Sequence, residues 1–181
     1  EEKVVGLNNS FTCTGSYESG GVVYHCWKLA GHGTQNFAQT LQNSCNPAFI
    51  SYGQALGKEK FREYFQAFGL TQTTGIDLPG EAGSIYHAEE DFGVTELSSS
   101  SFGQTFKVTA LQLITAVSAA VNGGELMQPY IVKQVVDEEK NVVSETTPAV
   151  KRQVISNETS ATMASLCESV VSEGSGRNAQ L

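Results

Sequence analysis

The chain has 181 residues, 40% hydrophobic and 17% charged, which is the composition of an ordinary globular protein. Its 19 acidic and 11 basic residues give a net charge of −8, which repels the phosphates of nucleic acids and argues against a nucleic-acid partner. Its most apolar run, residues 110–121, is too short and too polar to span a bilayer, so we expect a buried helix there. The length favours a single domain over residues 1–181.

The first elements that the sequence predicts are a hairpin and a short helix. Residues 10–28 alternate β-prone runs with a Gly-Gly pair, which predicts a hairpin closed by residues 18–21. Thr34 is the expected N-cap of a helix that continues toward Asn43.

Two more helices and a loop follow. Asn46 and Pro47 predict a helix start, because Asn caps free amides and Pro at the first helical position loses no hydrogen bond. Gly57 is expected to end this helix, and residues 58–68 to form the next one. Residues 70–82 are punctuated by Gly and Pro, which predicts a loop.

The central part of the chain contains one segment without a clear secondary-structure pattern and one with a clear helix pattern. Residues 83–107 lack clear periodicity, and we expect a loop with one short helix there. Thr109 and Gln112 form a capping-box pattern that opens the apolar helix ending at Val121.

The C-terminal part predicts a hairpin and a last helix. Residues 130–136 and 142–145 are β-prone and are separated by a charged turn. Ser156 is the expected cap of the last helix, in which Cys167 belongs to an apolar stripe and is expected in the core.

The stretch around Ser44 and Asn46 allows two interpretations. Locally, the two residues are a helix terminus and a helix cap. Alternatively, the ends of two helices hold a hydroxyl and an amide toward a common point, as a proton relay and a grip on a peptide bond require.

Other kinds of catalytic site find little support. His25, His32 and His87 occur without a G-x-S-x-G elbow or a nearby Asp-His pair, which argues against a hydrolase triad. The acidic residues between positions 77 and 91 are expected in loops, where a solvated role is commoner than a carboxylate pair.

The four cysteines are Cys13, Cys26, Cys45 and Cys167. No C-x-x-C pair occurs among them, and we therefore expect no zinc or other metal site.

Six parts of the chain match one protein family in that family's own order. They are FTCTG with CWKLAGHG, LQNSCNPAFI, TGIDLPGEA, SSFGQTFKVTALQL, AAVNGGELMQPYIV and VVSEGSG. Nearly the whole chain thereby resembles the transpeptidase domain of class B (monofunctional) penicillin-binding proteins, which cross-link peptidoglycan. The resemblance implies an α+β fold: the helical lobe and part of the sheet of the serine penicillin-recognising fold, shared with β-lactamases and DD-peptidases.

The family carries three catalytic motifs, S-x-x-K, S-x-N and K-T-G. Ser44-Cys45-Asn46 matches the second, whereas the first and third do not occur in residues 1–181. We therefore expect this chain to be an internal fragment, the segment between those two motifs. Thr105 also departs from the family's Gly-Gln-Gly pattern, which argues for a structural role of that loop.

The resemblance implies roles for two residues. Ser44 would relay a proton between the motif-one Lys and the substrate nitrogen, and Asn46 would bind the acyl side of the peptide or β-lactam. Because nucleophile, base and oxyanion donors lie in the missing motifs, we expect the fragment to be inactive and the intact protein to be a serine D,D-transpeptidase. The alternative is a non-catalytic, extracytoplasmic binding module of the same fold, and the flanking sequence discriminates between the two.

The resemblance also implies partners and a location. The intact protein would act on stem peptides ending in D-Ala-D-Ala, bind β-lactams, need no cofactor and join a cell-wall synthesis complex. It would be anchored by an N-terminal helix outside this chain, on the extracytoplasmic face of the bacterial membrane. The Cys-Trp and Ser-Cys-Asn sequences favour septal or sporulation enzymes of Gram-positive bacteria.

Two further expectations follow from that location and from the missing motifs. Disulfides persist outside the cytoplasm, so Cys26 pairs with Cys45, Cys13 pairs with Cys26, or all thiols are free. A Cys26–Cys45 bond would tether the hairpin to the S-x-N loop. Apolar surface left bare by the missing motifs predicts association of the fragment, as a dimer.

Overall fold

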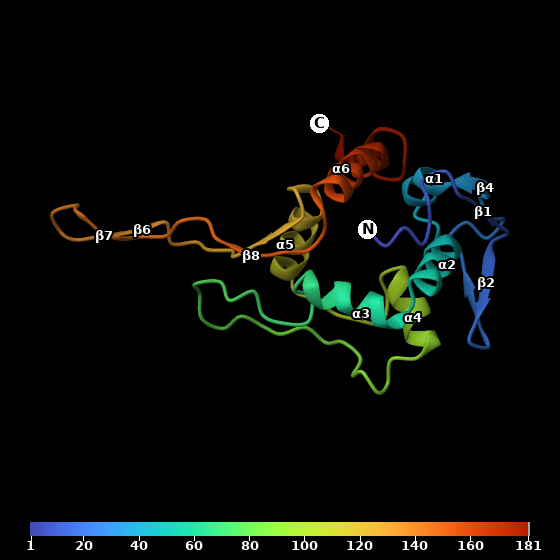
Figure 1. Cartoon of the computed structure of the whole chain (residues 1–181), viewed down its shortest axis with the longest axis horizontal. Coiled ribbons are helices and arrows are strands. Elements are labelled where there is room, and N and C mark those ends of the chain that lie inside the picture. Colours follow the sequence, from blue (N-terminus) through green and yellow to red (C-terminus); the bar gives the residue numbers. More distant parts are fainter. Residues whose placement is uncertain (181) are drawn as a thin grey trace. The chain divides into compact units, whose positions relative to one another are not determined.

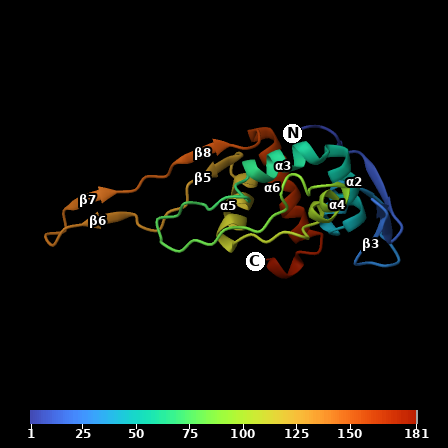
Figure 2. The same cartoon turned by 90° about the horizontal axis from the view of Figure 1, so that it is seen from below.

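The computed structural model describes residues 1–180, which form an α+β structure (Figures 1 and 2). The helices are α1 (Phe37–Gln42), α2 (Asn46–Leu56), α3 (Lys58–Ala67), α4 (Val94–Ser101), α5 (Ala110–Val121) and α6 (Asn157–Ser172), with a 3-10 turn at Arg177–Ala179. The strands are β1 (Ser10–Cys13), β2 (Ser16–Ser19), β3 (Val22–His25), β4 (Gly33–Asn36), β5 (Glu125–Met127), β6 (Gln134–Val136), β7 (Val142–Glu145) and β8 (Val150–Gln153). These strands pair antiparallel as β1–β4, β2–β3, β5–β8 and β6–β7.

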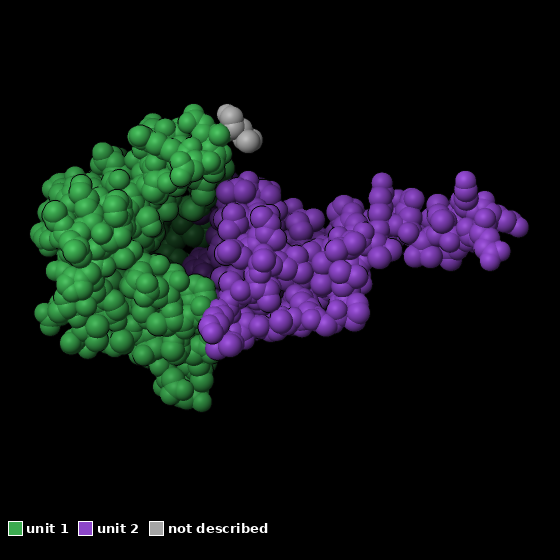
Figure 3. All heavy atoms as spheres, turned by 180° about the vertical axis from the view of Figure 1, so that it is seen from behind, with its two compact units in different colours: residues 1–63, 86–106, 162–181 green, residues 64–85, 107–161 purple. Residues whose placement is uncertain are grey.

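The chain divides into two compact units, coloured in Figure 3. Unit 1 comprises residues 1–63, 86–106 and 162–181, and unit 2 comprises residues 64–85 and 107–161. A single domain over the whole chain stays a prediction.

Local turn chemistry explains the N-terminal strands of unit 1. Gly20 and Gly21 both have positive φ, 59° and 77°, as a two-residue turn between twisted strands requires, and they close the predicted hairpin between β2 and β3. Thr34 lies in β4 and does not cap α1, so that prediction was wrong. The cap is Asn36, whose Oδ1 accepts a 2.9 Å hydrogen bond from Gln39 N. The backbone amide of Asn36 donates in return to Gln39 Oε1 over 2.9 Å, which completes a capping box.

Helix α2 begins with Asn46 itself, and the N-cap is Cys45, which makes no side-chain capping bond. The prediction that Asn46 caps the helix was therefore wrong, although Pro47 does lie in the first turn. Helix α2 ends at Gly57, as predicted, where φ is 84°.

Helices α2 and α4 pack closely in unit 1. A Cβ added at Gly53 would collide with the side chain of Ser101, so only glycine lets the two helices approach this far. Three serines of α4 donate their hydroxyls to carbonyls of the preceding helical turn; Ser98 Oγ, for example, donates to Val94 O over 2.7 Å, and Ser99 and Ser101 do the same.

In unit 2, α5 opens with the predicted capping box of Thr109 and Gln112. The prediction of a fully buried helix was wrong, because Leu113 and Ile114 are 53% and 60% exposed. The predicted hairpin is β6–β7, which continues outward from the β5–β8 pair in both views (Figures 1 and 2).

Helix α6 begins as predicted, since Ser156 Oγ accepts a 3.2 Å hydrogen bond from Thr159 N. Cys167, however, is exposed on this helix, and its predicted core position was wrong. Among residues 1–180, no helix has the length and apolar character needed to cross a membrane.

Candidate active-site segment

The S-x-N residues lie in a tight turn between α1 and α2. Ser44 has a φ of 48°, in the left-handed region, and its amide donates to Leu41 O over 3.0 Å. The amide of Cys45 then donates to Thr40 O, also over 3.0 Å. This backbone arrangement leaves Ser44 exposed and Cys45 fully buried, so the turn presents the serine to solvent and keeps the cysteine inside.

The connection between β3 and β4 holds this turn from a second side. Trp27 Nε1 donates to Asn43 O over 2.8 Å, and Asn43 Nδ2 donates to Gln35 Oε1 over 2.7 Å. Asn46 Nδ2 donates to His25 O over 3.2 Å. Because Asn46 is not the helix cap, its amide reaches the end of β3, and the turn is fixed by residues distant in sequence.

The buried side chain of Cys45 anchors the S-x-N turn to the core of unit 1. It packs in a core with Cys13, Cys26 and Ala48, and burial raises the pKa of its thiol to about 12. Such a thiol is not a nucleophile at neutral pH, because the thiolate is the reactive form. Ser44, which is exposed, and Asn46, which is half-buried, are therefore the candidate functional groups of this segment.

Four potential metal ligands meet at this core. The side chains of Cys13, Cys26, His32 and Cys45 bring their donor atoms within 4.8 Å of one another. Sequence spacing predicted no metal site, because the four residues come from separate segments that only the fold brings together. The cysteines are free thiols in this structure, and the Cys26–Cys45 disulfide stays a prediction.

Two of the acidic loop residues between positions 77 and 91, Asp77 and Glu81, accept hydrogen bonds from backbone amides. In unit 2, the carboxylate of Asp77 accepts 2.8 Å hydrogen bonds from the amides of Ile131 and Val132. Also in unit 2, Glu81 accepts from the amides of Thr74 and Gly75 over 2.7 and 2.9 Å.

In unit 1, Thr105 stands where the family pattern has its last glycine, and it adopts a positive φ of 66°. Its hydroxyl lies 2.9 Å from Ser99 Oγ. This bond holds a non-glycine residue in a conformation that usually favours glycine.

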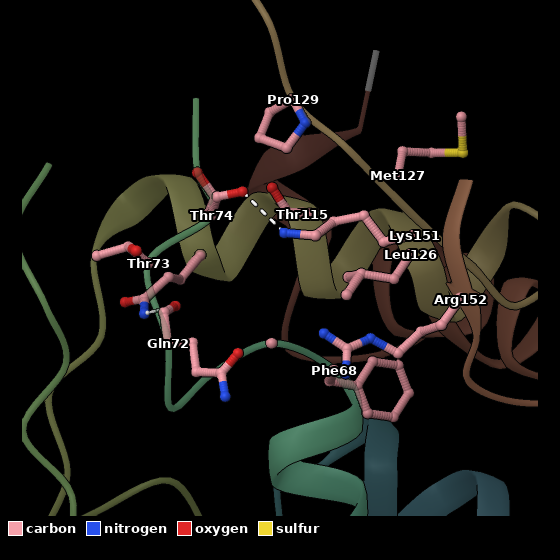
Figure 4. Close-up of a pocket in the computed structure, with 12 residues that line it drawn as sticks. Phe68, Gln72, Thr73, Thr74, Thr115, Leu126, Met127, Pro129, Lys151 and Arg152 are labelled. Atoms are coloured by element: carbon pink, nitrogen blue, oxygen red, sulfur yellow. Dashed lines mark hydrogen bonds between the residues drawn. The ribbon is translucent and has the colours of Figure 1, made fainter. Parts of the chain in front are cut away.

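Unit 2 contains a pocket between α5 and the β5–β8 pair (Figure 4). Lys151 points into it, and its Nζ donates to Thr74 O over 2.9 Å (Figure 4). Gln112 Nε2 likewise donates to Gln72 O over 2.7 Å. Because both groups are engaged by the backbone, their evident role is to hold the loop at residues 72–74.

Comparison with known proteins places this geometry in a family. The family described as penicillin binding protein transpeptidase domain matches residues 1–181. The chain belongs to this transpeptidase family. The resemblance found in the sequence is thereby confirmed.

Curated relatives of this transpeptidase-family chain include a sporulation protein. The chain is 47% identical over 180 residues to Stage V sporulation protein D of Bacillus subtilis, covering 99% of this chain and 28% of that protein. It is 32% identical to the penicillin-binding protein PbpB of Mycolicibacterium smegmatis, covering 87% of this chain and 24% of the relative. The transpeptidase-family chain thus spans about a quarter of the length of these relatives.

Solved structures confirm the α+β fold that we expected for a transpeptidase domain. The D,D-transpeptidase domain of an Eggerthella lenta peptidoglycan glycosyltransferase matches with a TM-score of 0.91 and 24% identity, over all of this chain and 47% of that one. Penicillin binding protein 3 of Mycobacterium tuberculosis in complex with aztreonam matches with a TM-score of 0.87 and 25% identity, over 97% of this chain and 40% of that one.

Proposed function

We propose that this chain supplies the S-x-N segment of a serine D,D-transpeptidase that cross-links peptidoglycan stem peptides and is acylated by β-lactams. The observation that carries the proposal is the rigid turn that exposes Ser44 beside Asn46 while Cys45 is buried. Relatives support it: a protein named peptidoglycan D,D-transpeptidase MrdA is 30% identical over 116 residues, and the M. tuberculosis protein has been solved with ampicillin as well as aztreonam.

Each of the two residues has a separate role in this proposal. Ser44 relays a proton between the catalytic lysine of the S-x-x-K motif and the nitrogen of the leaving or attacking group. Asn46 donates a hydrogen bond to the acyl side of the stem peptide or β-lactam. Proton transfer and substrate binding both need fixed distances, and the hydrogen bonds on either side of the turn supply that rigidity.

Acylation of the complete protein by fluorescent penicillin tests these roles. Ser44→Ala should slow acylation by roughly 10²–10⁴-fold, the usual effect of removing a general acid–base group. Asn46→Ala should weaken reversible β-lactam binding and slow acylation as well. The matched control is Ser165→Ala, which removes an exposed hydroxyl from α6 and should leave the rate unchanged.

An acylation rate that Ser44→Ala leaves unchanged would rule out the proton relay. Residues 1–181 contain neither S-x-x-K nor K-T-G, and we propose that this polypeptide alone is inactive. Covalent labelling of the isolated polypeptide by fluorescent penicillin would contradict that part. Absence of labelling in the complete protein would favour the non-catalytic binding module.

We further propose that the intact protein works on the extracytoplasmic side of the membrane, in a complex that builds the cell wall during sporulation or division. The sporulation relative supports this assignment. The exposed thiol of Cys167 gives a direct test, since a membrane-impermeant maleimide should label it in intact spheroplasts. Labelling only after lysis, with Cys167→Ser as the control for specificity, would overturn the location.

A further inference from the structure

We propose that Gly174 and Ser175, in the turn that follows α6, are positioning residues that hold the S-x-N turn in place for catalysis. The inference rests on the proposed function, because it assigns a role within the same site. The two residues belong to the segment VVSEGSG at residues 170–176, which matched the family by its sequence and contains none of the three catalytic motifs.

The carbonyl groups at the C-terminal end of α1 show what holds the S-x-N turn. The last four carbonyls of a helix have no partner within the helix and need one elsewhere. Here the carbonyls of residues 39–41 accept hydrogen bonds of 3.0 Å from the amides of residues 43–45, within the turn itself. The next two are bonded to distant segments: Asn43 O accepts from Trp27 Nε1 and Gln42 O from the amide of Ser175, each over 2.8 Å. The turn is therefore closed by local bonds and held in place by two distant ones.

Gly174 allows the second of these distant contacts. A Cβ built on Gly174 would lie 2.7 Å from Gln42 O, 2.8 Å from Gln42 Cα and 2.9 Å from Gln42 Cβ. Carbon atoms pack at about 3.5–4.0 Å, and two of the three atoms belong to the backbone of α1, which cannot rotate aside as a side chain can. Gly174 is not among the glycines with a positive φ, so its conformation does not require glycine. The missing side chain is needed for the close approach to α1.

The turn that follows α6 is itself closed by hydrogen bonds. The amide of Gly176 donates to Val170 O over 3.0 Å, and Arg177 Nη2 donates to Glu173 O over 3.1 Å. The side chain of Glu173 also accepts a 3.2 Å hydrogen bond from Gln42 Nε2. A fixed turn after α6 thus contacts the last residue of α1 through both backbone and side chain.

This contact lies two residues before the proposed proton relay. Because the local bonds join residues 39–45 into one unit, a displacement of Gln42 is carried to Ser44. Ser44 has a φ of 48°, and such a conformation persists only where the surrounding structure fixes it. A shift of about 1 Å in a catalytic group can reduce catalysis about 10²-fold. The contact with the α6 turn therefore supports the geometry that a proton relay needs.

Acylation of the complete protein by fluorescent penicillin, at a temperature at which each variant is folded, tests the positioning. Gly174→Ala should slow acylation by about 10–100-fold, because the added methyl group moves the end of α1 by about 1 Å. Gly83→Ala is the matched control. It makes the same substitution at a glycine whose added Cβ meets no atom within 4 Å, and it should leave the rate unchanged.

A double-mutant cycle separates positioning from a general loss of folded protein. If Gly174 acts through the hydroxyl of Ser44, most of its effect disappears once that hydroxyl is removed. In the Ser44→Ala background, Gly174→Ala should therefore slow the remaining acylation by less than about threefold. A purely structural effect would reduce the rate by the same factor in both backgrounds.

Hydrogen exchange of the complete protein, resolved to single amides, gives a readout that does not depend on activity. In the wild type, the amide of Ser175 should be protected, because it donates to Gln42 O. In Gly174→Ala, the amides of Ser44 and Cys45 should exchange roughly tenfold faster, because the end of α1 loses its contact. If Gly174→Ala does not fold, the wild type still decides: the amides of Ser175 and Ser44 should open with the same dependence on denaturant.

Three results would overturn the proposal: a Gly174→Ala protein that is acylated at the wild-type rate, an equal loss in both backgrounds, or a Ser175 amide that exchanges as fast as in an open chain. Failure of the proposed function would look different. Ser44→Ala with a normal acylation rate would reject the proton relay, whereas faster exchange at Ser44 in Gly174→Ala would still show that the α6 turn holds the S-x-N turn.

Discussion

Ser44, the residue for which we propose a proton relay, has an unfavourable backbone conformation. Its φ of 48° costs an L-residue about 1–2 kcal/mol relative to the right-handed region. The turn remains in this conformation because the amides of Ser44 and Cys45 donate to helix carbonyls and Trp27 donates to Asn43 O. A serine held at a position that suits glycine indicates that its hydroxyl is needed there.

The substitution Ser44→Gly tests the proposed role of the hydroxyl in acylation separately from its effect on protein stability. Glycine adopts positive φ without strain, so the free energy of unfolding should stay within about 1 kcal/mol of the wild type. Acylation by penicillin should nevertheless fall as far as in Ser44→Ala. Urea denaturation and acylation kinetics on the same preparation measure both effects, and a Ser44→Gly protein with normal acylation would show that the hydroxyl is dispensable.

Among the elements, the contact between α2 and α4 supports the helix that follows the S-x-N turn. Gly53 makes the close approach to Ser101, and Ser19 Oγ lies 2.7 Å from Ser98 Oγ where β2 meets α4. A substitution of Gly53 by alanine therefore has two opposing effects on the stability of the protein. Alanine favours a helix interior by about 1 kcal/mol over glycine, whereas overpacking costs about 1–3 kcal/mol.

We expect Gly53→Ala to destabilise the protein by about 1–2 kcal/mol, because the added methyl group meets the Ser101 side chain. Thermal and urea unfolding measure this. Gly83→Ala is the control, since a Cβ there meets no atom within 4 Å. A Gly53→Ala protein more stable than the wild type would mean that Ser101 moves aside and that helix propensity dominates.

In unit 2, Asp77 connects the loop at residues 74–82 to the segment between β5 and β6, through hydrogen bonds with Ile131 and Val132. The hydrogen bonds from the amides of Val132 and Ile131 lower the pKa of this carboxyl below its usual 3.8. A lowered pKa in the folded state means that the stabilisation is complete above the unfolded value and is lost as the pH falls through the folded one.

Asp77→Asn should therefore lower the thermal midpoint at neutral pH, and its difference from the wild type should shrink as the pH falls below about 3.8. Glu138→Gln, an exposed carboxylate between β6 and β7, controls for the loss of one negative charge. A difference that is independent of pH would show that the Asp77 charge contributes nothing to these bonds.

The whole molecule presents apolar surface in addition to its net charge of −8. One side of α5 exposes large aliphatic side chains: Leu113, Ile114, Val117 and Val121. Exposed apolar patches usually mark contact surfaces. They agree with the expectation that the isolated chain associates.

Light scattering of the polypeptide 1–181 should show a mass that rises with concentration toward a dimer. Replacing Leu113 and Ile114 by glutamine should abolish this association, because it removes apolar area from α5. Val143→Gln, at an equally exposed position of β7, should have a smaller effect. A monomeric wild type at high concentration would contradict the prediction.

Sequence by itself determined the features that depend on neighbouring residues. These features are the capping box of Thr109 and Gln112, the Gly-Gly hairpin turn and the end of α2 at Gly57. Each follows from hydrogen bonds and backbone conformations within three or four residues. The order of the motifs likewise identified the family and the Ser44–Asn46 segment.

Only the tertiary structure decided what depends on distant segments. The pairing of β1 with β4 brings Cys13 opposite Gly33, next to His32, and the packing of α2 adds Cys45 to the same cluster. The folded chain also leaves one side of α5 and Cys167 exposed, contrary to their apolar patterns. Periodicity identifies the apolar side of a helix, but burial depends on whether another segment covers that side, which is a property of the folded chain.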